Sequence, residues 1–108
     1  MKAPAPSLLR ARMSSATSAQ LRIRMRHPME SGQRRDELGR FIPARHITDF
    51  VLQLNEQPLL SGQFGPGISQ DPYLELTLKG VKAGDRLQLE WIDTTGARRM
   101  DRAPIDPA

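Results

Sequence analysis

Apolar and polar residues alternate with a period of two along much of this chain. From Leu21 to Arg26, aliphatic residues occupy every second position, and Arg22, Arg24 and Arg26 lie between them. Such alternation is typical of β-strands that bury one face. Five later segments have strand-like sequences: residues 48–54, 59–64, 73–79, 87–91 and 97–105. The sequence therefore predicts six or seven short strands and no helix.

Turn-forming residues separate these segments every 8 to 12 residues or so, a spacing typical of an antiparallel two-sheet β-sandwich. We interpret Trp91 as a core residue rather than a ligand-stacking one, because it lies in the middle of a late strand. The space between the sheets would be filled by Trp91 together with Phe50, Leu52, Leu76 and Leu89. We interpret the arginine row at 22–26 as a solvated strand face, of the kind that protects strand edges, rather than a functional basic stripe.

The two ends of the chain differ in character. Residues 1–20 are rich in Ala, Pro and Ser and predict a flexible arm, whereas residues 21–108 predict one domain. Met13 marks the change, which suggests the hypothesis that translation begins there. No apolar run is long enough for a membrane span, and proline and arginine interrupt any signal-peptide core. We therefore expect no signal peptide on this chain and no membrane partner.

Residues 27–45 contain turn formers but neither strand alternation nor a lasting helical period. They predict a long ordered connection such as a protruding hairpin, and connections of this length usually serve a function. This segment is the leading candidate for a contact surface.

The formal net charge of +4 is unevenly distributed. Residues 1–26 carry six basic side chains and no acid, whereas residues 27–108 carry ten basic and twelve acidic side chains. A DNA-reading domain would concentrate lysine and arginine on its folded body. We therefore expect no nucleic-acid partner.

The sequence offers no residue set for catalysis, so we predict no enzyme, no metal site and no cofactor. Cysteine is absent, and His27 and His46 lie too far apart for a metal-binding motif. The carboxylates of Asp36, Glu37 and Asp49 lie near arginines and are interpreted as surface ion pairs. No serine hydrolase motif is present, and the glycines of residues 62–67 match a bulge, a left-handed turn or a close backbone contact better than a phosphate loop.

Several motifs occur in the order found in SoxZ, the smaller subunit of the SoxYZ sulfur carrier of bacterial thiosulfate oxidation. They span about residues 21–105, and the chain resembles this family over nearly the whole predicted domain. The matching residues are His27-Pro28-Met29-Glu30 with Gly32, Asp36, Gly39, Ile42-Pro43-Ala44, Phe64-Gly65-Pro66 with Ser69, Pro72-Tyr73-Leu74, Gly84-Asp85, Trp91, Asp93 and Gly96. Two positions depart from the pattern: Phe64 stands where members often carry tryptophan, and His46 is shifted by one residue through Arg45.

The resemblance implies an immunoglobulin-like β-sandwich that acts as a non-catalytic subunit. Its partner would be SoxY, whose cysteine carries the sulfur intermediates, in a heterodimer or heterotetramer that contacts other Sox enzymes transiently. The implied location is the periplasm, reached by export together with the signal-bearing partner. The alternative is a stand-alone β-sandwich that binds through its basic arm and strand face.

We predict the partner interface in residues 27–45 and in the segment of residues 64–68. Apolar side chains between turns need a dry environment. The candidates are Met29, Phe41, Ile42, Phe64, Gly65, Pro66 and Ile68, although Phe41 and Ile42 could instead fold back on their own domain. Arg34, Arg35 and Arg40 are candidates for steering an anionic sulfur adduct, with a solvated loop as the alternative.

Overall fold

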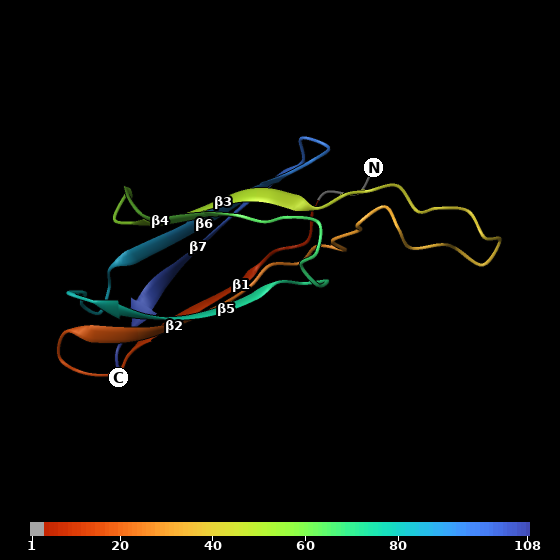
Figure 1. The fold of residues 1–108 in the computed structure, drawn as a ribbon. Coiled ribbons are helices and arrows are strands. Elements are labelled where there is room, and N and C mark those ends of the chain that lie inside the picture. Colours follow the sequence, from red (N-terminus) through yellow and green to blue (C-terminus); the bar gives the residue numbers. More distant parts are fainter. Residues whose placement is uncertain (1–3) are drawn as a thin grey trace.

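The computed structural model describes residues 4–108 as seven strands in two layers (Figure 1). The strands are β1 (Leu8–Met13), β2 (Ser18–Arg24), β3 (Ile47–Leu54), β4 (Gln57–Gln63), β5 (Tyr73–Lys79), β6 (Arg86–Asp93) and β7 (Arg98–Asp106). None of the described residues belongs to a helix that could cross a membrane. The prediction of an all-β sandwich with six or seven strands is confirmed.

The pairing of β7 with β1 joins the two layers. The hydrogen-bonded order is β4-β3-β6-β7-β1-β2-β5, and the sheet curls between β7 and β1 so that β1, β2 and β5 form the second layer. All pairs are antiparallel except β1 and β7, which run parallel and pair at Ala11 with Ile105 and at Arg12 with Asp106. This arrangement is immunoglobulin-like, with the one parallel pair as a departure from the predicted antiparallel order.

The core lies between the layers and is formed by alternate residues of the strands. Trp91, Leu52 and Leu89 are almost fully buried, and Phe50 is buried beside them, as predicted. Leu76 is only half-buried, because β5 is an edge strand.

The edge strand β4 lies against Phe50 through a glycine. An added Cβ at Gly62 would lie 2.5 Å from the Phe50 ring, so a larger residue here would force this buried ring to move. The predicted close backbone contact is therefore found at Gly62, whereas Gly65 and Gly67 have open space around them. β4 itself is exposed along its length, including Leu59 and Leu60, which the sequence did not single out.

The prediction that residues 1–20 form a flexible arm is wrong for residues 8–13 and 18–20, which belong to β1 and β2. β1 pairs along its full length with β2, and Leu9, Ala11 and Met13 point into the core. The strand alternates, but alanine and a run of only six residues give a weak local signal. Its stability comes from pairing with β2 and β7, which local pattern does not reveal. Residues 1–3 of the predicted arm lie outside the described residues.

The arginine row of residues 22–26 does not protect a sheet edge. β2 lies between β1 and β5, so both of its hydrogen-bonding sides are occupied. Arg22 and Arg24 point outward from an interior strand, and edge protection therefore does not explain them.

We expect a chain that starts at Met13 to be much less stable than the full chain. It would lack most of β1, would uncover β2 and would lose the link between the layers. The buried surface of Leu9 and Ala11 alone corresponds to about 2 to 3 kcal/mol. Urea unfolding would measure the difference, with a chain lacking only residues 1–5 as the control. Equal stability of the Met13 form and the control would show that β1 is dispensable.

Candidate functional site

A hairpin arm, residues 28–46, projects from one end of the sandwich (Figure 1). Near its base, the amide of Glu30 donates to the carbonyl of Arg45 at 2.6 Å, and the amide of Arg45 donates back to Glu30 at 2.9 Å. Farther out, the amides of Asp36 and Ile42 donate to the carbonyls of Arg40 and Arg34. The predicted protruding hairpin is confirmed, and its backbone is ordered by its own hydrogen bonds.

Asp36 holds the turn at the tip of the hairpin arm. Its carboxylate accepts the backbone amides of Leu38 at 2.9 Å and Arg40 at 3.0 Å, and Gly39 takes the positive φ of 78° that the turn requires. The hydrogen bond from the Arg40 backbone amide holds the pKa of Asp36 below its ordinary value, against a smaller opposing effect of burial. The turn is thus defined by its own sequence.

Apolar side chains at the tip are exposed to solvent. Leu38 is 77% exposed and Phe41 is 59% exposed, and the Arg35 guanidinium lies 4.3 Å from the centroid of the Phe41 ring. Ile42 is half-buried. Phe41 therefore does not fold back into the core, and the arm presents an apolar tip that needs a partner to become dry.

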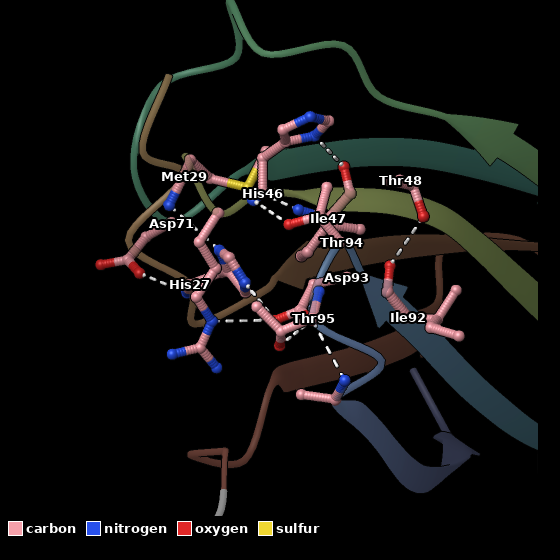
Figure 2. A network of polar contacts seen from close by, with 12 residues as sticks. His27, Met29, His46, Ile47, Thr48, Asp71, Ile92, Asp93, Thr94 and Thr95 are labelled. Atoms are coloured by element: carbon pink, nitrogen blue, oxygen red, sulfur yellow. Dashed lines mark hydrogen bonds and ion pairs between the residues drawn. The ribbon is translucent and has the colours of Figure 1, made fainter. Parts of the chain in front are cut away.

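The base of the hairpin arm is anchored by the buried carboxylate of Asp93, which is 4% exposed (Figure 2). One of its oxygens lies 2.9 Å from His27 Nε2 and 3.0 Å from Arg45 Nε. These two residues stand at the two ends of the arm, so a single oxygen holds both of its strands.

The other oxygen of Asp93 fixes the turn between β6 and β7. It accepts the backbone amide and hydroxyl of Thr95, at 2.9 and 2.6 Å, and the amide of Ala97 at 3.1 Å. Burial by itself raises the pKa of Asp93, but the hydrogen bonds from Thr95, His27 and Arg45 outweigh it and lower the pKa well below its ordinary value. Asp93 is therefore held as a carboxylate.

The hydrogen bonds of His27 fix its tautomer. The backbone amide of Met29 donates to His27 Nδ1 at 3.0 Å, so Nε2 carries the proton and donates it to Asp93. The His27 ring also packs edge-on against Trp91, with 5.2 Å between centroids. The anchor is thereby packed directly onto the core.

The anchor suits a structural role. Five donors surround the Asp93 carboxylate, and both His27 nitrogens are engaged, so neither group has a free position for a substrate proton. Among residues 4–108, no group of three or more His, Cys, Asp or Glu side chains could hold a metal ion. What the arrangement does chemically is hold the hairpin arm in place.

The structure brings the second predicted contact segment to the same end of the molecule. The amide of Asp71 donates to the His27 carbonyl, and the His27 amide donates to the Asp71 carboxylate, both at 2.9 Å. Before this tie, Gly65, Pro66 and Ile68 are exposed. Phe64 is half-buried, with its ring 5.1 Å from that of Phe50.

Met29 is different from the other predicted interface residues. Its side chain is only 6% exposed, and its sulfur accepts the backbone amide of Ile47 at 3.3 Å. A hydrophobic residue in a loop can pack into the core of its own domain. Here Met29 packs where the hairpin arm meets β3. Its side chain is not available to a partner.

The three arginines predicted to steer anions are largely engaged within the hairpin arm. Arg34 forms an ion pair with Glu30, and Arg40 forms one with Asp36 at 3.0 Å. Arg35 stacks on Phe41 and donates to the Gly39 carbonyl. The surface ion pair predicted for Asp36 is present, and the positive charge of the tip is mostly compensated.

The anchor was not predicted from the residues alone. His27 and His46 were interpreted as too far apart for a metal site, and Asp93 was named only among the motif residues. The available signal was the order of motifs, because His27, Asp93 and Gly96 all belong to it. His46 contributes less, with Nδ1 3.0 Å from the Ile47 carbonyl oxygen.

Together, the fold and the site define an immunoglobulin-like sandwich that presents an ordered hairpin arm. The chain matches the family described as "Sulphur oxidation protein SoxZ" over residues 9–104. It belongs to the SoxZ family and thereby to the Sox system of sulfur oxidation. The match begins within β1, so the resemblance extends farther toward the amino terminus than the motifs indicated.

Solved structures of another protein share the fold. Two structures of a superoxide reductase (neelaredoxin) from Ignicoccus hospitalis, the first of a point variant, have TM-scores of 0.68 and 0.67 and are 18% identical to this chain. The similarity covers 98% and 97% of this chain and 82% of each of those chains. At this identity the likeness concerns the fold alone. No curated protein matches the chain.

We expect Asp93→Asn to lower the free energy of unfolding by about 3 kcal/mol, because it leaves Arg45 without its buried counter-charge. The loss should also depend on pH. Because folding lowers the pKa of Asp93, its stabilisation is complete above the ordinary pKa of 3.8 and disappears as the pH falls below it. Urea unfolding between neutral and strongly acidic pH would measure this.

Asp36→Asn is the matched control, because this carboxylate pairs with Arg40 at the exposed tip. The two variants should differ clearly at neutral pH and converge in strong acid. If Asp93→Asn lost no more stability than Asp36→Asn, Asp93 would not be the anchor of the arm.

Proposed function

We propose that this chain is the non-catalytic subunit of a heteromeric sulfur carrier. In this role it supports a SoxY-like subunit, whose cysteine carries covalently bound sulfur intermediates during thiosulfate oxidation. The observation that carries the proposal is membership of the SoxZ family combined with an anchored hairpin arm that ends in exposed apolar residues.

The chemistry of the chain supports this division of labour. None of its 108 residues is cysteine, so a sulfur intermediate bound through a thiol requires a second chain. The most buried acid, Asp93, is fully occupied in holding the arm. A supporting subunit needs shape and contact surface, and the hairpin arm supplies both.

The partner is proposed to bind at the end of the sandwich that carries the hairpin arm. Phe41 and Ile42 lie on the arm, and Ile68 lies in the segment that Asp71 ties to His27. Burying an exposed aromatic side chain in an interface can contribute 2 kcal/mol or more to binding. Ordering of the arm before binding also lowers the entropic cost of association.

We further propose that the complex works in the periplasm and that this chain is exported together with its signal-bearing partner. There it would present the loaded subunit to other Sox enzymes through transient contacts. The proposed location and the proposed assembly, a heterodimer or heterotetramer, are those that the family resemblance implies.

Co-expression with the proposed partner tests the proposal. The partner to use is a secreted protein that is encoded by a neighbouring reading frame and ends in a glycine-rich tail containing cysteine. We expect the two chains to copurify as a stable complex from the periplasmic fraction. Phe41→Ala combined with Ile68→Ala should raise the dissociation constant by about 30-fold or more, because both side chains would lose buried apolar surface. Calorimetry of the purified chains would measure it.

Leu59→Ala is the matched control, because Leu59 is 44% exposed on β4 and lies near Leu54, at the opposite end of β3 from the arm. It should leave the dissociation constant nearly unchanged. A well-behaved monomer without affinity for the cysteine-bearing protein would contradict the carrier role. Equal effects of the control and the double variant would contradict the proposed contact surface. Deleting the partner's signal peptide should leave both chains in the cytoplasm.

A further inference from the structure

Four arginines from two strands meet on the outer face of the second layer. We infer that this arginine face, formed by Arg10, Arg12, Arg22 and Arg24, is a docking surface for a protein that presents a cluster of carboxylates. It is separate from the hairpin arm and goes beyond the proposed carrier role.

The strand register places these arginines in one row across the two strands. Arg10 of β1 lies directly opposite Arg22 of β2, and because the strands are antiparallel, Arg12 and Arg24 extend the row in opposite directions from this pair. In the sequence the two pairs are separated by the β1–β2 turn. The face exists only because residues 8–13 form a strand rather than a flexible arm.

The fold does not require positive charge on this face. Core packing uses the opposite side of both strands, where Leu9, Ala11, Leu21 and Ile23 are buried. Like charges directly opposite each other on neighbouring strands are destabilising. Edge protection does not apply, because β1 and β2 are both interior strands. The face therefore bears a cost that binding of an anionic partner would offset.

Few acids of the chain compensate the face. Glu75 on β5 reaches Arg22 at 3.6 Å, with both side chains well exposed. Asp106 lies next to Arg12 in the register, but no ion pair joins them in the described structure. Arg10 and Arg12 are exposed. They also line, with Arg22, a groove of about 660 Å³ in which three arginines face the one acid, Asp106, so that it could accept further acidic side chains.

The shape of the face favours a protein over nucleic acid or membrane. A broad sheet face does not enter a DNA groove, which admits a helix or a two-stranded ribbon. The one aromatic side chain beside this face, Tyr73, already has one side of its ring occupied by the Arg24 guanidinium, 4.8 Å from the ring centroid, and a single ring is a small stacking platform for bases. The face also lacks the apolar side that anchors an interfacial membrane element. The guanidinium groups are distributed over a sheet face, and a protein surface can present carboxylates with a similar distribution.

Two triple variants with equal net charge test the inference. Arg10→Gln with Arg12→Gln and Arg22→Gln alters the face, and Arg34→Gln with Arg35→Gln and Arg40→Gln alters the hairpin arm. Each removes three positive charges from the chain. A fluorescent glutamate peptide of about ten residues serves as the acidic probe, and anisotropy at low and high salt measures its affinity.

At low salt we expect the face variant to bind the peptide about tenfold more weakly than the unaltered chain, with a flatter salt dependence. The arm variant should change much less, because Arg34 and Arg40 already have partners in the arm. Equal losses in the two variants would show that binding follows net charge alone and would overturn the inference. Thermal unfolding checks the fold, and the single variants Arg10→Gln and Arg22→Gln replace the triple one if it unfolds.

The class of partner is tested with the same chain. Tighter binding of a short DNA duplex, or of phosphatidylglycerol vesicles, than of the glutamate peptide at physiological salt would overturn the choice of a protein. The result is independent of the carrier role, because the face variant should still copurify with the cysteine-bearing partner. Loss of copurification in the face variant would instead place Arg10 and its neighbours in that interface and overturn their assignment to a separate surface.

Discussion

The architecture of the functional end depends on one buried carboxylate, that of Asp93. Removing it from water is costly, and the cost is offset because five hydrogen bonds, two of them from His27 and Arg45, surround its two oxygens. These bonds tie three segments that are far apart in the sequence: the two ends of the hairpin arm and the turn between β6 and β7. Without a charged acceptor here, the donors of all three segments would lose their common partner, and the buried His27 Nε2 proton would be left unpaired.

The anchoring at Asp93 allows the hairpin arm to present a fixed contact surface. A hairpin of this length would sample many orientations if only its ends were connected to strands. Anchoring at His27 and Arg45 fixes its direction, and the turn at Asp36 fixes its tip. Apolar residues such as Phe41 can then remain exposed without collapsing onto the core. The proposed supporting role, which depends on association, is consistent with a rigidly held arm that exposes apolar residues.

The molecule presents two kinds of surface that follow from different physics. The arm offers apolar area at one end, which would stabilise a lasting complex by excluding water. The arginine face offers charge on the outside of a rigid sheet, which acts at longer range and weakens with salt. A subunit that remains bound to one partner while meeting others transiently would use both. Family membership places the chain in the Sox system of sulfur oxidation, and the transient contacts are part of the proposed function.

The sequence by itself determined the strands after residue 20, most of the core and the hairpin arm. Alternation at residues 21–26 and 48–54, Trp91 within a strand, and the turn formers of residues 27–45 are local properties, and local properties predict local structure. The order of the motifs predicted the SoxZ family, and the absence of cysteine is consistent with a partner that carries the sulfur-binding thiol. The tertiary structure alone decided which segments meet: β1 with β2, Arg10 with Arg22, and His27 with Asp93, 66 residues apart. Register and burial depend on contacts between distant segments. For this reason Met29 is a core residue and not an interface residue, and residues 8–13 form a strand where the sequence predicted a flexible segment.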